Sequence, residues 1–168
     1  MENLQKKIKK FKNTPQTLIN ILDKMPKDIS KGILYSNLKN YRNLNEIFEK
    51  KKILLVLLDP PNKNVGHFII IIKKNQMYEI FGGYGLNIKS LINILKLDDI
   101  LLRMLSNINY SNNKYHYEQL SRNIKDCGLY CIVRAYKWYL SNKEFNYFFQ
   151  FPGLNSDNLV SLLTIILF

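Results

Sequence analysis

The chain is poor in the residues that bind metals and form disulfides, with two cysteines and two histidines among 168 residues. Cys127 and Cys131 lie four residues apart in a stretch with helical spacing, so they share a helix face and do not encode a disulfide framework. A zinc site needs further ligands at suitable spacing, and only His67 and His116 are available. We therefore expect no metal site, and a reducing compartment fits this cysteine usage.

Long apolar segments are also missing. The runs Ile69–Ile72 and Leu159–Phe168 are too short to span a bilayer. The first 13 residues, MENLQKKIKKFKN, are charged and lack the apolar segment of a signal peptide. We therefore expect an intracellular protein that is neither secreted nor held in a membrane, with one domain over residues 1–168 and a basic lead-in at 1–13.

Acidic residues are scarce: 13 Asp and Glu face 25 Lys and Arg, which gives a net charge of +12. Nearly all of the basic residues are lysines, which bind phosphate as point charges without reading bases. The many Lys, Asn and Ile residues are also typical of an AT-rich genome, so the charge has two interpretations. The functional one predicts non-specific DNA binding, with DNA as a stimulating polyanion.

Hydrophobic patterning predicts an α+β fold. Apolar runs indicate buried strands at 53–58 and 66–72, and a third strand at 77–81 forms a hairpin with the second. Helical spacing predicts a helix over 14–24 with Thr14 as its N-cap, one or two helices over 87–106, and a last helix over 159–167. Alternating tyrosines suggest a fourth strand at 114–120, and aromatic residues at 145–151 are expected to cover apolar surface.

The stretch from Asp126 to Arg134 predicts a helix whose first turn contains Cys127. Unpaired N–H groups and the dipole at a helix start favour negative charge, so they stabilise a thiolate there. Gly128 would let a substrate backbone come close. A small buried cysteine that opens a core helix explains the helix equally well, so the helix alone leaves both interpretations open.

Two residues upstream favour the nucleophile. His67 opens a predicted strand and is the residue best suited to deprotonate a thiol, whereas His116 lies between tyrosines and is a weaker alternative base. Gln119 precedes Cys127 and can offer a side-chain N–H to an oxyanion, together with the amide of Cys127 itself. We expect Cys131, one turn further on, to pack inside the helix–sheet interface.

This order of motifs resembles the adenovirus-protease and SUMO-protease clan of cysteine peptidases (clan CE). Members of that clan read Gly-His-Trp before an apolar strand, then a strand that ends in an acidic residue beside an aromatic residue and glycine. A glutamine then precedes Cys-Gly-x-[Tyr/Phe]-Cys. The matching pieces here are Gly66-His67-Phe68, Ile80-Phe81-Gly82-Gly83-Tyr84-Gly85, Gln119 and Cys127-Gly128-Leu129-Tyr130-Cys131. The compact chain looks most like the virus branch, the capsid-maturation proteases of adenoviruses, virophages and Polinton-type elements, and within it a virophage protease of the mavirus kind.

The resemblance implies a papain-like, adenain-like fold: a central mixed sheet flanked by helices, with the nucleophile at a helix N-terminus. It also implies a cysteine endopeptidase that processes viral capsid or structural proteins during virion maturation and cuts near small residues such as glycine. His67 and Cys127 would carry the chemistry, with Gln119 at the oxyanion and no required cofactor. The expected partners are capsid proteins and DNA, the expected state is a monomer, and the expected location is the host cytoplasm, the viral factory or the virion.

Two departures from the clan pattern stand out. Gly82 occupies the position of the acid that would orient the histidine, and Glu79 is on the opposite face of its strand by alternation. Gln119 is also slightly further from Cys127 than in the clan pattern. Besides a Cys–His dyad, two alternatives stay open: an isopeptidase for ubiquitin-like modifiers, and a catalytically inactive, basic module that binds DNA or protein.

Overall fold

The structure is a computed structural model, and it describes residue 6 and residues 16–61, 66–75, 77–117, 126–150 and 156–167. Its centre is a five-stranded mixed sheet with the order β1-β2-β3-β4-β5. The central three strands are antiparallel, while β1 and β5 pair parallel at the edges. The strands are β1 (Ser30–Leu34), β2 (Ile53–Leu58), β3 (His67–Lys74), β4 (Met77–Phe81) and β5 (Tyr110–Asn112).

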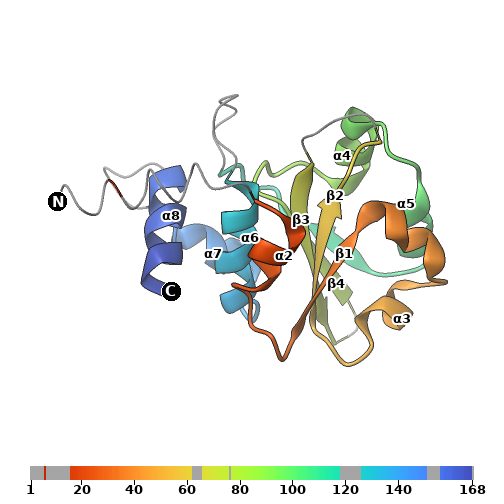
Figure 1. Ribbon diagram of the computed structural model, residues 1–168, viewed down its shortest axis with the longest axis horizontal. Coiled ribbons are helices and arrows are strands. Elements are labelled where there is room, and N and C mark those ends of the chain that lie inside the picture. The colour runs from red at the N-terminus through yellow and green to blue at the C-terminus, as the bar shows by residue number, and fades with distance from the viewer. Residues whose placement is uncertain are drawn as a thin grey trace.

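Helices cover both faces of this sheet (Figure 1). One core cluster contains residues of α2, α6, α7 and α8 together with Phe68, Ile70 and Ile72 of β3. The second contains residues of α3, α4 and α5 together with Ile69 and Ile71 of the same strand. The helices are α2 (Leu18–Leu22), α3 (Leu44–Phe48), α4 (Ile88–Leu95), α5 (Ile100–Leu105), α6 (Cys127–Tyr136), α7 (Asn142–Tyr147) and α8 (Ser156–Leu167), with a 3-10 helix at Tyr35–Asn40.

The central strands form where the sequence predicts them. The residues from Ile53 to Leu58 and from His67 to Ile72 are almost all buried, as expected of strands covered on both faces. A hairpin joins β3 and β4, in which Ile70 is opposite Phe81. The predicted α+β class and its mixed sheet are therefore confirmed.

Several boundaries differ from the prediction. Helix α2 starts after Thr17, whose hydroxyl accepts a hydrogen bond from the amide of Asn20 at 3.1 Å; the predicted cap Thr14 lies outside the described residues. The predicted strand at 114–120 is wrong for its described part, because 113–117 are irregular and β5 ends at Asn112. Strand β1 and helix α7 were not predicted.

No helix in the described part of the chain is both long enough and apolar enough to cross a membrane.

Candidate active site

Cys127 is the first residue of α6, as the sequence predicts. Only 8% of Cys127 is exposed, and the backbone carbonyl of Asp126 just before it accepts hydrogen bonds from the amides of Leu129 (2.8 Å) and Tyr130 (3.1 Å). These bonds close the first turn of the helix. Cys131 lies one turn later and is completely buried in the core beneath α6, also as predicted. The two thiols are not joined in a disulfide.

His67 is the first residue of β3 and only 5% of it is exposed. Burial lowers the pKa of its imidazole to about 4, from an ordinary value near 6.5, because a charged ring would lose its hydration. The ring is therefore neutral at physiological pH. The Nε2 atom is fully buried and forms no hydrogen bond with any described residue. The other histidine, His116, has an exposed side chain.

Helix α6 packs against β3, and the two elements run in the same direction (Figure 1). Lys74 is the last residue of β3, and Leu140 lies four residues beyond the end of α6. The ammonium group of Lys74 donates to the carbonyl of Leu140 at 2.8 Å. Because the end of β3 meets the segment that follows α6, and the two elements run in the same direction, their first residues lie toward the same end of the sheet. Cys127 and His67 are these first residues.

Backbone hydrogen bonds connect the surroundings of the two residues. The turn after β4 contributes the carbonyl of Gly83, which accepts from the amide of Tyr117 at 2.9 Å. The carbonyl of Tyr117 lies 3.1 Å from the hydroxyl of Tyr130, three residues after Cys127. The hydroxyl of Tyr130 is also 2.9 Å from the buried Oδ1 of Asp157 on α8. The turn beside His67 is thereby tied to the first turn of α6.

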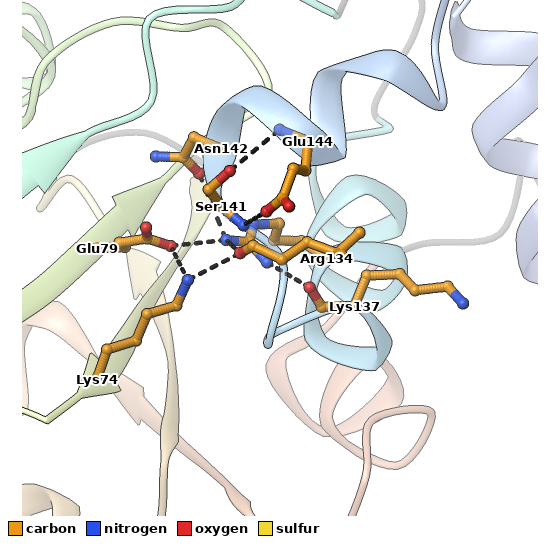
Figure 2. A network of polar contacts seen from close by, with 8 residues as sticks. Lys74, Glu79, Arg134, Lys137, Ser141, Asn142 and Glu144 are labelled. Carbon is orange, nitrogen blue, oxygen red and sulfur yellow. Dashed lines mark hydrogen bonds and ion pairs between the residues drawn. The ribbon is translucent and has the colours of Figure 1, made fainter.

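A buried ion pair anchors the other end of α6 (Figure 2). Arg134 is completely buried, and its guanidinium donates to the Glu79 carboxylate on β4 at 2.7 Å. Lys74 approaches the same carboxylate at 3.0 Å, and Arg134 also donates to the carbonyls of Lys137 and Leu140. Burial lowers the pKa of Arg134 to about 10, and the nearby Glu79 opposes this change, so the guanidinium stays charged at neutral pH. The pair holds α6 against the β3–β4 hairpin.

This pairing also decides the role of Glu79. It belongs to the α6 face of the sheet, where Arg134 and Lys74 hold its carboxylate. Gly82 is on the other face: a Cβ atom built on it would lie 3.4 Å from the Nε2 of His67 and 3.2 Å from Ile69 Cγ2. The position next to the histidine ring is therefore occupied by a residue without a side chain, as the sequence suggests.

One contact at the helix N-terminus was not predicted. The amide of Gly128 donates to Oε1 of Gln16, 112 residues earlier, at 2.9 Å. A Cβ atom on Gly128 would collide with that oxygen and come within 2.6 Å of Ile21 Cδ1, so only glycine fits here. Gln119, the predicted oxyanion donor, lies outside the described residues. The stacking of Tyr84 on His67 was also missed, although Tyr84 follows the Gly-Gly pair that the resemblance singled out.

Comparisons with known proteins give one related sequence and several related folds. No family model matches the chain. The uncharacterized protein V9 of Sputnik virophage is 23% identical over 155 aligned positions, which cover 79% of this chain and 85% of that protein. The crystal structure of the ASFV pS273R protease matches 92% of this chain and 68% of that protease, with a TM-score of 0.51 and 12% identity. The SUMO protease Ulp1 matches 96% of this chain and 80% of its own chain, with a TM-score of 0.46 and 12% identity. The chain thus shares its fold with a viral protease.

Proposed function

We propose that the protein is a cysteine endopeptidase that processes viral capsid or structural proteins during virion maturation. The observation that supports this most is that Cys127 opens α6 and His67 opens β3 at the same end of two packed, parallel-running elements. A thiol at a helix start and an imidazole at the same end of the sheet are the two groups that nucleophilic catalysis by cysteine needs. The shared fold with the ASFV pS273R protease and the similarity to a virophage protein agree with a viral protease.

In this proposal the neutral imidazole of His67 accepts the proton of the Cys127 thiol as the sulfur attacks the scissile carbonyl. A carbon–sulfur bond forms, and the carbonyl electron pair moves to the oxygen. When the tetrahedral intermediate collapses, the carbon–nitrogen bond breaks and the leaving amine takes the proton from His67. Water, deprotonated by the same ring, then hydrolyses the thioester and restores the thiol.

The oxyanion would be held at the start of α6. The proposed donors are the amide of Cys127 and the side chain of Gln119, because preorganised N–H groups stabilise the developing charge. The carbonyl of Asp126 already accepts from Leu129 and Tyr130, and the side chain of Gln16 from Gly128. The amide of Cys127 is the first in the helix and is therefore the natural donor to a substrate.

Co-expression with a candidate capsid protein from the same virus tests this function. Wild type should cut the capsid protein, and Cys127→Ala should not. Cys131→Ala is the matched control, because it removes the other thiol of the same helix from the core rather than from the helix start. Absence of cleavage by wild type, or equal cleavage by Cys127→Ala, would refute the maturation role. Cleavage of a ubiquitin-like fusion in place of the capsid protein would instead indicate an isopeptidase.

Alkylation distinguishes an enzyme from an inactive binding module. Iodoacetamide near neutral pH should modify Cys127 faster than Cys131, because only Cys127 lies at a helix N-terminus. Equal rates for the two thiols in the folded protein would contradict an activated thiol at Cys127. Alkylation requires no substrate, so it remains informative while the substrate is unidentified.

We also propose that DNA binds at the start of β2 and the end of β3, the end of these strands opposite the proposed active site. An open hollow of about 500 Å³ is lined there by Glu49, Lys50, Lys51, Lys52, Lys73, Lys74, Asn75, Trp138 and Tyr139. The ammonium group of Lys52 lies 4.5 Å from the centre of the Trp138 ring, and Tyr139 is 59% exposed. Clustered lysines beside aromatic rings are suited to phosphates and stacked bases.

The single tryptophan of the chain lies in this hollow, so its fluorescence reports on binding without any peptidase assay. Titration with oligo(dT) should change the emission, and the affinity should fall steeply as salt rises. Lys50→Glu should weaken binding more than Lys89→Glu, which makes the same charge change on α4. Salt-independent binding, or equal effects of the two variants, would contradict a site at this hollow.

A further inference from the structure

In the described part of the chain, no carboxylate is paired with Nε2 of His67. Its Nε2 atom is buried, forms no hydrogen bond with a described residue, and faces the backbone of Gly82. The contact that the structure does give this ring is an aromatic one.

The ring of Tyr84 lies on the ring of His67. The two ring centres are 4.6 Å apart and the planes are 20° from parallel, which is a stacked arrangement. His116 contacts the ring of Tyr84 with a centre distance of 6.4 Å and an angle of 61°. Tyr84 and His116 are the titratable groups that the structure describes in this stack beside His67.

The chain places Tyr84 there through a tight turn. The amide of Gly85 donates to the carbonyl of Gly82 at 3.1 Å, so the four residues from Gly82 to Gly85 fold back toward the start of β3. The side-chain amide of the buried Asn113 donates to the same carbonyl at 3.0 Å, which fixes the turn against the segment after β5. Gly85 has a φ of +64°, and a Cβ atom there would lie 2.6 Å from the carbonyl oxygen of Tyr115. The same turn therefore has glycine at position 82 and places the ring of Tyr84 on the ring of His67.

We propose that Tyr84 is a positioning residue for His67, which orients the imidazole by stacking in place of the missing carboxylate. This inference rests on the proposed function, in which His67 is the base. Stacking fixes the plane of the ring but supplies no negative charge. The imidazole therefore stays neutral until it takes the proton from Cys127, and the thiolate–imidazolium pair is not formed in advance.

Substitution of Tyr84 tests the role. Tyr84→Ala should lower kcat by about 10- to 100-fold with little change in KM, because a misoriented base costs rate more than binding. Tyr84→Phe keeps the ring and should keep most of the activity. Tyr147→Ala, an exposed tyrosine on α7, is the matched control for removal of an aromatic side chain. A rate for Tyr84→Ala equal to that of wild type would overturn the proposal.

A titration separates positioning from general destabilisation. The chain has two histidines, so NMR resolves their rings, and His116→Gln assigns them. In Tyr84→Ala, water reaches the ring, so the midpoint of His67 should rise from about 4 toward the unperturbed value of about 6.5, together with the acidic limb of the rate profile. An unchanged midpoint would contradict the stack. If wild type cleaves nothing, the proposed function fails, whereas the titration still decides whether Tyr84 holds the ring.

A carboxylate introduced at position 82 provides the complementary test. Gly82→Asp places its Cβ about as close to Nε2 as van der Waals contact allows, and Gly82→Ala makes the same contact without charge. In the Tyr84→Ala background, Gly82→Asp should restore activity at least 5-fold relative to Gly82→Ala, on the order of one charge-assisted hydrogen bond. Equal activity of the two double variants would refute the idea that stacking substitutes for an acid.

Discussion

The neutral, buried ring of His67 predicts that the folded protein loses stability in acid. Burial lowers its pKa from 6.5 to about 4, whereas the unfolded chain keeps the ordinary value. Between these two values the unfolded chain takes up a proton that the folded protein does not. Stability is therefore fully retained above pH 6.5 and decreases as the pH falls toward 4. The difference of about 2.5 pKa units corresponds to about 3 kcal/mol at pH 4.

Urea denaturation at pH 7, 6, 5 and 4 measures this loss, followed by the fluorescence of the single tryptophan. Other groups also titrate in this range, so the informative quantity is the difference between wild type and His67→Gln. The glutamine side chain of His67→Gln lowers the free energy of unfolding by an amount that does not depend on pH. His116→Gln is the control, because it makes the same change at the exposed histidine. If wild type and His67→Gln lose stability in parallel between pH 7 and 4, the ring is not buried and neutral, and the reasoning fails.

Three further predictions concern the anchoring of α6 and are measured by urea denaturation at pH 7. Glu79→Gln should destabilise the fold by about 3 kcal/mol, because it leaves the completely buried Arg134 without its counter-charge. The double variant Glu79→Leu, Arg134→Met should recover most of this loss, and no recovery would contradict the ion-pair explanation. Gly128→Ala should cost about 1–3 kcal/mol despite the better helix propensity of alanine, because its Cβ would collide with Gln16; a neutral or stabilising effect would show that Gln16 moves freely. Tyr130→Phe should cost about 1–2 kcal/mol through loss of the hydroxyl between Tyr117 and Asp157, and an unchanged midpoint would argue against that contact.

The middle of the sheet could be predicted because its strands are long and nearly continuous in β-branched and apolar residues. Both Ile53–Leu58 and the run of isoleucines after His67 lie between turns, so each is predicted to be a buried strand. The edge strands could not be predicted in the same way. Ser30–Leu34 contains lysine and glycine, and Tyr110–Asn112 is three residues long. These edge strands form because β2 and β4 offer them backbone hydrogen bonds. The local sequence of an edge strand does not show which strand it will pair with.

The candidate site also combines local features that the sequence predicts with distant contacts that it does not. Local sequence predicts a cysteine at a helix start and a histidine at a strand start, because each property depends on neighbouring residues. Contacts between distant segments were missed: Gln16 reaches Gly128 across 112 residues, and Arg134 reaches Glu79 across 55. The expectation that Glu79 points away from position 82 held, because alternation along a strand is a local rule.

The two faces of β4 explain why no residue already present in this strand can complete a triad. The pairing of Ile70 with Phe81 fixes the register, and a shift by one residue would exchange every core side chain between the α6 face and the α4 face. Glu79 is therefore locked on the α6 face by the register as well as by Arg134. The histidine faces position 82, where the chain has glycine. A charged partner for His67 from β4 would require a substitution at position 82 itself, and the turn that begins there instead provides the ring of Tyr84.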